Sequence, residues 1–367
     1  MGEFELIKYI QTRLARPLPE SVVLGIGDDA AILATPSNQH VVVTSDTLNA
    51  GVHFPRDTSA ENIGYKSLAV SLSDLASMGA KPWWFNLNLS LIDLDFDWME
   101  GLLDGLNDAM DGNDIVIIGG DTTGGPLFLS ITAAGLCEPG KALRRDGAKP
   151  GEDVWVSGSI GDAACALQHM DTASVDLMAR LNRPTARLEL GQKLAHDGLA
   201  SSCADISDGL LADAGNIAAR SGVAIQIIAA DIPIADEVKR LDPNNALKYA
   251  ATGGDDYELV FTADAAHRNA LKNLSAELTL PLTRIGTVLQ GQGVHLLDAD
   301  GAEVSVKSLG YDHFSSTSTR CGTSSIAVDQ RDHIPISHRS GRRALRPVDL
   351  GQGTTPRRGA GDDASSS

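Results

Sequence analysis

Strand-like and helix-like patterns of hydrophobic residues alternate along the first 140 residues. Residues 40–48, "HVVVTSDTL", predict a buried strand that ends in polar residues, and residues 83–91, "WWFNLNLSL", alternate as a strand does. Apolar residues at helical spacing predict a helix over 59–80, with Ser59 as its N-cap, and another over 98–111. Because strands and helices interleave, the pattern predicts a mixed α/β domain.

A second series of predicted elements follows a polar segment rich in Gly and Pro, "RRDGAKPGED" at 144–153. This series includes the strand pattern "DYELVFTA" and a helix near 264–277, and it ends near "GYDHF". We therefore expect an N-terminal domain over 1–143 and a C-terminal domain over 144–314. The remaining residues, 315–367, are polar, rich in Arg and almost without apolar periodicity, so disorder is expected there.

The composition excludes several kinds of partner. The formal net charge of the 367 residues is −18, which argues against nucleic acid and against an anionic membrane surface. The chain does not open with a signal-peptide pattern, and no apolar run approaches the ~18 residues of a membrane helix. The four cysteines form no Cys-x-x-Cys pair, so we expect buried thiols, except for Cys321 in the tail, and a reduced, cytoplasmic protein.

Aspartates with Gly, Ser or Thr neighbours recur where the predicted strands end or the predicted helices begin. They are Asp28 and Asp29 in "GIGDD", Asp46 in "TSDT", Asp74 in "LSDL", Asp121 in "GGDTT", Asp205 and Asp208 in "DISDG", and Asp255 and Asp256 in "GGDDYEL". Carboxylates, hydroxyls and main-chain carbonyls are the hard oxygen ligands that Mg²⁺ and Ca²⁺ prefer. Each motif alone could be an ordinary turn or a helix cap, with Asp205 or Ser207 capping in "DISDG". The whole set favours several divalent ions around a polyphosphate, and hence phosphoryl transfer.

The better-known nucleotide-binding motifs are absent from the sequence. No Gly-x-x-x-x-Gly-Lys-Ser/Thr occurs, which excludes a P-loop protein. "GIGDDA" lacks the third glycine of a dinucleotide fingerprint, and the sequence contains neither the His-Arg-Asp and Asp-Phe-Gly motifs of protein kinases nor a His-Glu-x-x-His zinc motif. A phosphoryl-transfer enzyme of another type is therefore indicated.

A set of motifs, in this order, resembles the thiamine-monophosphate kinases over about residues 2–314. The motifs are "GIGDDAAIL", "VTSDTLNAGVHF", "YKSLAVSLSDLASMGAKPWW", "GGDTTGGPL", "KALRRDGAKPGEDVWVSGSIGDAA", "DISDGLLADAGNIA", "GGDDYELVFTA" and "GYDHF". The resemblance implies transfer of the γ-phosphoryl group of ATP onto thiamine monophosphate, which gives thiamine diphosphate. It also implies the two-domain α/β (α+β) fold of the aminoimidazole-ribonucleotide-synthetase superfamily, a PurM-like fold. In that fold the N-terminal domains of two subunits form a β-barrel, so a homodimer is expected.

The resemblance also assigns roles to particular residues. The implied metal ligands are Asp29, Thr44, Ser45, Asp46, Asp74, Asp121, Asp205 and Asp208, with Asp46 and Asp121 acting in catalysis through the metal. The implied ATP contacts are Gly120, Asp121, Arg145 and Ser207, and the implied thiamine-phosphate contacts are His53, Asp255 and Tyr311. The implied cofactors are several Mg²⁺ ions, with K⁺ as a candidate further ion. Because the acceptor phosphate is already ionised near neutrality, no strong general base is required.

Two departures from the family pattern and several alternatives remain at this point. Gly124 stands where the family usually has Arg or another polar residue, and Asp255 replaces a common Glu. A selenophosphate synthetase would have a reactive cysteine near its N-terminus, but the first cysteine here is Cys137. A hydrogenase-maturation relative would end in a Cys-bearing tail, whereas this chain ends in serines. A metal-dependent phosphatase and a non-catalytic acidic cation-binding protein also fit the carboxylates.

Overall fold

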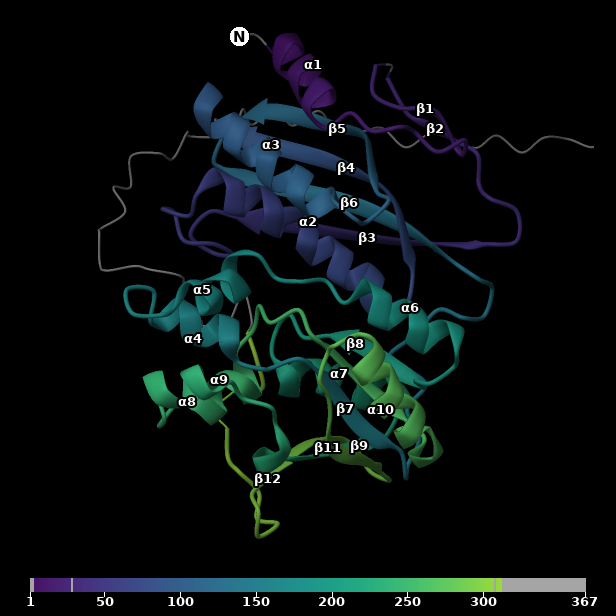
Figure 1. The fold of residues 1–367 in the computed structure, drawn as a ribbon, viewed down its shortest axis with the longest axis vertical. Coiled ribbons are helices and arrows are strands. Elements are labelled where there is room, and N and C mark those ends of the chain that lie inside the picture. The colour runs from purple at the N-terminus through teal and green to yellow at the C-terminus, as the bar shows by residue number, and fades with distance from the viewer. Residues whose placement is uncertain (1–2, 28, 307, 312–367) are drawn as a thin grey trace, which may run out of the picture. The chain divides into compact units, whose positions relative to one another are not determined.

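The computed structural model describes residues 3–27, 29–306 and 308–311, and two larger β-sheets with their helices form most of this part of the chain (Figure 1). The first sheet has four strands in the order β3-β6-β4-β5. These strands are β3 (His40–Asn49), β6 (Phe128–Cys137), β4 (Lys81–Leu91) and β5 (Val116–Gly124). Before them come α1 (Glu3–Arg13) and a small ribbon in which β1 (Val22–Leu24) pairs with β2 (Ile32–Leu33). The predicted α/β organisation is confirmed, and the predicted disordered tail lies outside the described residues.

The second sheet has six strands in the order β12-β9-β11-β7-β10-β8. Its strands are β7 (Asp153–Ser157), β8 (Ser202–Asp205), β9 (Ala224–Ile228), β10 (Leu259–Ala263), β11 (Leu282–Leu289) and β12 (Gly293–Leu297). The helices of this half are α4 (Asp162–Gln168), α5 (Val175–Asn182), α6 (Leu188–His196), α7 (Leu210–Ser221), α8 (Asp236–Leu241), α9 (Ala246–Thr252) and α10 (Arg268–Glu277). The chain thus passes from the first sheet to the second between Cys137 and Asp153.

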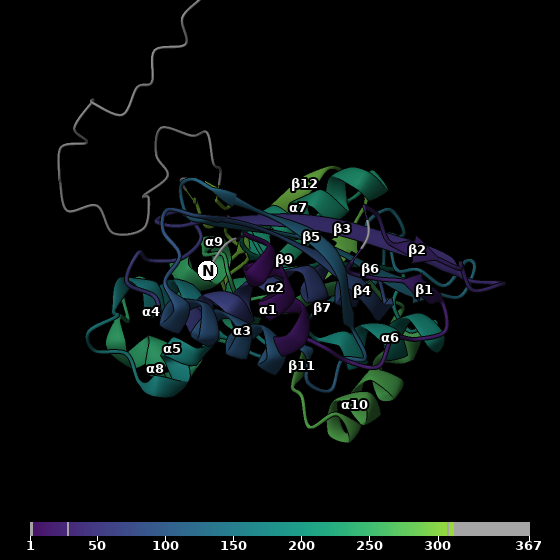
Figure 2. The same ribbon diagram turned by 90° about the horizontal axis from the view of Figure 1, so that it is seen from above.

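Two helices, α2 (Ala60–Ser77) and α3 (Phe96–Met110), pack closely together beside the first sheet (Figures 1 and 2). The predicted N-cap is confirmed, because the Ser59 hydroxyl accepts a hydrogen bond from the Asn62 amide. A Cβ atom added to Gly64 would lie 2.0 Å from the Leu102 carbonyl oxygen, so only glycine permits this approach of the helices. Helix α2 also contacts β3, β6, α6 and β8, so it reaches both halves of the molecule.

Strand β3 differs from its prediction as a buried strand. It lies at the edge of the first sheet, and its side chains alternate between exposed and covered positions. Val43 is 59% exposed, and Val41 is exposed on the same face. The other face of β3 lies against α2. The run of three valines concealed this alternation, because an edge strand with an apolar outer face has the same sequence pattern as a buried strand.

The predicted burial of the cysteines is borne out within the described residues. Cys137, Cys165 and Cys203 are buried, whereas Cys321 lies outside the described part of the chain. None of the described helices combines the length and the apolar character needed to cross a membrane.

Candidate functional site

The first part of the site is formed where β3 faces α2. Thr44 and Asp46 lie two residues apart on β3, so their side chains point to the same face of the sheet. The Asp46 carboxylate accepts a 2.8 Å hydrogen bond from the Ser71 hydroxyl, and the Thr44 hydroxyl donates to the carboxylate of Asp74. Burial, with the nearby charge of Asp74, raises the pKa of Asp46 to about 6. Burial also raises the pKa of Asp74. The carboxylates of Asp46 and Asp74 are therefore both buried, and the hydrogen bonds that they accept here come from hydroxyl groups.

A third carboxylate comes to the same place from the other half of the chain. Asp205 ends strand β8 and is 1% exposed, and it accepts a 2.9 Å hydrogen bond from the Ser73 hydroxyl of α2. Burial and the charge of Asp74 raise its pKa well above the ordinary range. The positive charge of Arg145 acts against this rise at both Asp74 and Asp205. The structure thus brings together Asp46, Asp74, Asp205 and Arg145 from four separate sequence motifs.

The loop after β8 is held by an acid that the sequence analysis missed. The Asp213 carboxylate, in the first turns of α7, accepts hydrogen bonds of 3.1, 3.1 and 3.2 Å from the amides of Ser207, Asp208 and Gly209. Burial and the charge of Asp208 raise the pKa of Asp213 to about 7. The cap expected from Asp205 or Ser207 is therefore supplied by Asp213. A signal was present, since an acid in the first turn of a helix is a common partner for free amides.

The predicted thiamine-phosphate contacts lie beside this group of acids. Tyr257 donates from its hydroxyl to Asp255 at 3.1 Å, and burial, with the charges of Asp255, Asp205 and Asp46, raises the pKa of Tyr257. The other oxygen of Asp255 accepts a 3.1 Å hydrogen bond from Lys66 on α2. The Lys66 ammonium also donates to the main-chain carbonyl of His53 at 3.2 Å. Sequence reasoning passed over Lys66 and Tyr257, because neither residue type is distinctive within a helix or before a strand.

Three further predicted residues differ in where the structure places them. The Tyr311 amide donates to the Asp208 carbonyl at 2.9 Å, which places Tyr311 beside the loop after β8. Asp29 is exposed, and its neighbour Asp28 lies outside the described residues. Ser45 has its hydroxyl 3.1 Å from that of Thr132, on the face of the sheet opposite to Asp46. A contribution of Ser45 to a metal site would therefore come from its main-chain carbonyl.

Asp121 lies apart from the other acids. It is exposed on β5, at the opposite edge of the sheet from β3 (Figure 1). It is in register with Asn88, Ser130 and Thr47 across the sheet, so it shares their face, whereas Asp46 points to the other face. Two strands lie between β3 and β5, so the main chain at Asp121 is about 14 Å from the main chain at Asp46 in the same molecule. The structure thus does not bring these two predicted catalytic residues together within one chain.

Two glycines of β5 frame Asp121. Gly120 has φ of +151°, and a Cβ atom there would lie 1.9 Å from the Leu87 carbonyl oxygen, so no side chain fits between β5 and β4. Gly124 is exposed and has open space around it. The polar side chain that the family usually has at that position would therefore find room here.

The oxygen donors suit a divalent cation, although they do not form a closed metal cage within the described part of the chain. Among the described residues no three His, Cys, Asp or Glu side chains are grouped closely enough to hold a metal ion. Asp46, Asp74 and Asp205 nevertheless are hard donors whose pKa values are raised by burial, and the charge of Asp74 raises those of Asp46 and Asp205 further. A bound cation would offset both costs, so the chemistry of these residues fits Mg²⁺.

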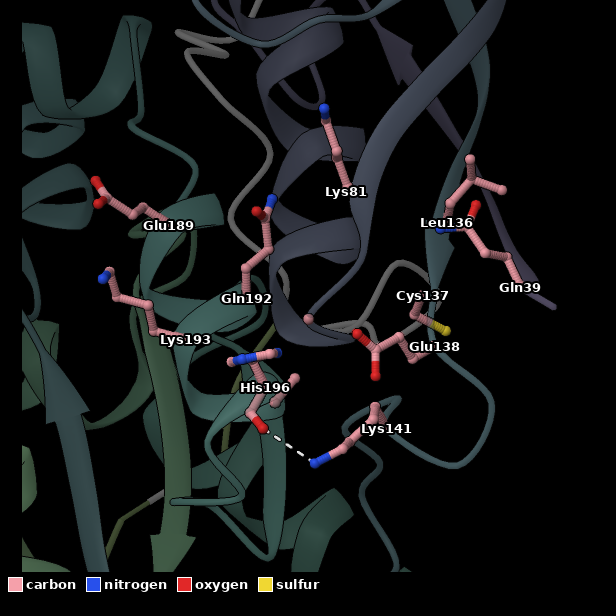
Figure 3. A pocket seen from close by; sticks show the side chains of 12 residues that line it. Gln39, Lys81, Leu136, Cys137, Glu138, Lys141, Glu189, Gln192, Lys193 and His196 are labelled. Atoms are coloured by element: carbon pink, nitrogen blue, oxygen red, sulfur yellow. Dashed lines mark hydrogen bonds between the residues drawn. The ribbon is translucent and has the colours of Figure 1, made fainter. Parts of the chain in front are cut away.

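A separate cavity of about 380 Å³ lies elsewhere on the molecule (Figure 3). Its lining includes Lys81, Lys141, Glu138 and Gln192. The Lys141 ammonium is held by the main-chain carbonyl of His196 at 3.0 Å. None of the predicted site residues lines this cavity.

Comparison with known families defines the class of protein first. The family model for the AIR synthase related protein, N-terminal domain, matches residues 27–137, and the model for the C-terminal domain of the same family matches residues 149–298. The fold is therefore the two-domain α/β fold of AIR synthase related proteins, as the resemblance implied.

Individual relatives are more specific. The thiamine-monophosphate kinase of Escherichia coli (strain K12) is 41% identical over 324 residues, which are 86% of this chain and 99% of that protein. A crystal structure of thiamine-monophosphate kinase from Stenotrophomonas maltophilia K279a has 50% identity and a TM-score of 0.75, and covers 83% of this chain and 98% of its own. "AaThiL complexed with AMPPCP and TMP" has 33% identity and a TM-score of 0.68, with coverage of 85% and 97%. The chain belongs to the thiamine-monophosphate kinase family.

Proposed function

We propose that this protein transfers the γ-phosphoryl group of ATP to thiamine monophosphate and so forms thiamine diphosphate. The family membership carries this proposal, since the relatives match over 86% of the chain and 99% of their own length. A related structure was obtained with AMPPCP and TMP together, so one fold holds a nucleotide analogue and the second ligand at once. The buried acids fit this chemistry, because two anionic substrates can approach each other only where cations offset their repulsion.

Each group of residues has its own part in the proposed reaction. Asp46, Asp74 and Asp205 would hold Mg²⁺, together with the other ligands that the family resemblance implies, among them Thr44, Asp29 and Asp208. When bound, Mg²⁺ neutralises phosphate charge and keeps the attacking and leaving oxygens in line. Arg145 lies within electrostatic reach of the same acids and would hold the ATP phosphates with its planar guanidinium. His53, Asp255 and Tyr311 would orient thiamine monophosphate, whose phosphate needs no strong base.

A homodimer is part of the proposal, because Asp121 and Asp46 are separated within one chain. The outer face of the first sheet, on which Asp121 lies, also carries the exposed Val41 and Val43. On the same sheet the buried side-chain atoms Trp84 Nε1 and Asn86 Oδ1 have no hydrogen-bond partner among the residues that the structure describes. Within residues 3–27, 29–306 and 308–311, one edge of the ten-residue β3 is paired with no other strand, and such an edge favours association with a strand of another molecule. If β3 of each copy lay beside β5 of the other in a closed barrel, this face would be covered and Asp121 of one copy would lie beside the strand that carries Asp46 in the other.

The activity is tested by incubating the protein with ATP, Mg²⁺ and thiamine monophosphate and by measuring both ADP and thiamine diphosphate. Equal amounts of the two products are expected, and free thiamine is expected to give no product. Release of ADP without thiamine diphosphate would identify a phosphatase instead. Binding of Mg²⁺ without loss of ATP would favour the non-catalytic cation-binding protein.

The shared site is tested by mixing two inactive variants, Asp46→Asn and Asp121→Asn, after partial unfolding and refolding. If each site takes one acid from each copy, a mixed dimer contains one intact site, and about a quarter of the wild-type activity returns. If both acids serve the same site within one chain, every site in the mixture is defective. No activity would then return, and the shared site would be wrong.

A further inference from the structure

Lys66 is a buried cation at the centre of the substrate side of the site. Its side chain is only 3% exposed, although lysine is rarely buried unless it is paired. Its ammonium donates to the Asp255 carboxylate at 3.1 Å and to the His53 carbonyl at 3.2 Å. These two residues lie 202 positions apart in the sequence and come from different halves of the chain. Lys66 therefore connects both of them to helix α2.

The segment from Asp255 to Glu258 is strained and is held at each residue by a different element. Asp255 and Tyr257 have φ of +72° and +51°, which L-residues seldom adopt. Asp256 accepts hydrogen bonds from the amides of Gly161 and Ala163 at 2.6 and 3.2 Å, at the start of α4. Such strain persists only where the surroundings fix the conformation, and it is common at ligand-binding positions.

The last residue of the segment has arginine partners. Glu258 is fully buried and accepts hydrogen bonds from Arg180, Arg187 and Ser157. The partner of Asp255 is instead a lysine from α2, the helix that also carries Asp74, Ser71 and Ser73. The position of Asp255 is thereby tied to the same helix that positions the acids around Asp46.

The His53 side is fixed as well. The His53 carbonyl accepts from Lys66, and its ring Nδ1 accepts a 3.0 Å hydrogen bond from the Asn49 amide at the end of β3. The neutral imidazole then carries its proton on Nε2. Residues of the N-terminal half therefore fix both the main chain and the ring of His53. Lys66 contacts His53 and also Asp255 of the C-terminal half.

We propose that Lys66 is a positioning residue for thiamine monophosphate: through its bonds to Asp255 and His53 it holds these two groups at the separation that the substrate requires. The inference rests on the proposed function and names a residue that the family resemblance did not assign. Lys66 acts through Asp255 and His53 and needs no contact with ATP. Its loss should therefore weaken the use of thiamine monophosphate and leave the use of ATP nearly unchanged.

The test is Lys66→Met, which keeps an unbranched side chain that is one atom shorter and removes its charge. The KM for thiamine monophosphate is expected to rise by about tenfold or more, because a hydrogen bond to a charged group is lost, while the KM for ATP changes by less than about twofold. Lys66→Arg keeps the charge and should recover part of the loss. The control is Lys81→Met, since Lys81 also has an aspartate partner at 3.1 Å, Asp114, but this pair is exposed. The control should leave both KM values unchanged.

A double variant separates positioning from general damage. Because the Asp255 arm is already lost in Asp255→Asn and only the bond to the His53 carbonyl remains, Lys66→Met in that background should raise the KM for thiamine monophosphate by much less than the tenfold expected in the wild-type background. The double variant also removes the unpaired carboxylate, so it gives the answer if Lys66→Met alone fails to fold. Additive effects, an unchanged KM for thiamine monophosphate, or an equal rise in both KM values would overturn the inference. A wild-type protein that makes no thiamine diphosphate would overturn the proposed function and the inference together.

Discussion

Two groups of buried carboxylates in this molecule have opposite electrostatic environments. In the C-terminal half, Glu258 is bonded by Arg180 and Arg187, and despite burial these arginines keep its pKa below the ordinary value. Between the two halves, the hydrogen-bonding partners of the Asp46 and Asp205 carboxylates within the described part of the chain are serine hydroxyls, and burial raises the pKa values of both acids.

The difference distinguishes a structural acid from a binding acid. A buried carboxylate with its own arginines is neutralised within the fold, so nothing further is needed. A buried carboxylate with only hydroxyl donors keeps an uncompensated cost, which a cation from solution can remove. Burial alone does not separate the two groups, since Glu258 and Asp205 are both nearly inaccessible to solvent. The two groups differ in whether the hydrogen-bonding partner of the carboxylate is a charged arginine or a neutral hydroxyl.

The largest expected effect comes from Asp46→Asn. We expect kcat/KM to fall by about a thousandfold or more, because the variant removes a charge that acts on the transferred group through Mg²⁺. The free energy of unfolding measured without metal should not fall, since a neutral amide ends the repulsion with Asp74. Steady-state kinetics and urea unfolding measure the two quantities. Activity near that of the wild type would remove Asp46 from the site.

The matching change in the structural group is Glu258→Gln. It should lower the free energy of unfolding by about 3 kcal/mol, because the two arginines lose the charge that compensates them. Glu258→Gln should therefore lower the free energy of unfolding strongly and lower the kcat of the folded fraction only slightly. Asp46→Asn should do the reverse. Urea unfolding in the presence of EDTA measures this. A stability equal to that of the wild type would contradict the distinction between the two groups.

Removal of metal gives the next effect in size. Mg²⁺ at a hundredfold excess over its dissociation constant should stabilise the wild type by about 2.7 kcal/mol relative to EDTA. In Asp205→Asn this stabilisation should largely disappear, although the variant in EDTA should be at least as stable as the wild type, since a strongly disfavoured charge is gone. Thermal unfolding with and without Mg²⁺ tests both statements. An undiminished effect of Mg²⁺ in the variant would show that Asp205 is no ligand.

Much of the fold around these acids could be predicted from periodicity. The helix with Ser59 as its N-cap and the strand at 83–91 are present, with the strand extended by two residues at its start. The strand at 40–48 is also present, but its predicted burial is wrong, because the neighbours on its two faces are set by the rest of the fold. The hydrophobic pattern indicates which residues of a strand are able to be buried. The order of the strands in the sheet determines which of these residues are buried in the fold.

The site could be predicted less completely. The aspartate motifs identified Asp46, Asp74 and Asp205, which the fold does bring together. They gave no indication that Asp121 lies on the other face and the other edge of the same sheet. Lys66 was also passed over, because its partner lies 189 positions away, and no local pattern records such a pair. Charge compensation over long sequence separations is a property of the fold.

The smallest effect concerns Asp256, a third kind of buried acid, with main-chain amides as its hydrogen-bonding partners. Burial raises its pKa to about 8, against the partial compensation that Arg180 provides. Between pH 4 and 8 the folded protein therefore binds a proton at Asp256 that the unfolded chain has lost, so the stability falls as the pH rises through this range. In Asp256→Asn the loss of unfolding free energy from pH 6 to pH 8 should be about 2 kcal/mol smaller than in the wild type. Asp236→Asn, whose side chain is 99% exposed in the wild type, should keep the wild-type slope. Urea unfolding at the two pH values decides the matter, and equal slopes in all three proteins would mean that the amides of Gly161 and Ala163 compensate the charge as fully as arginines do.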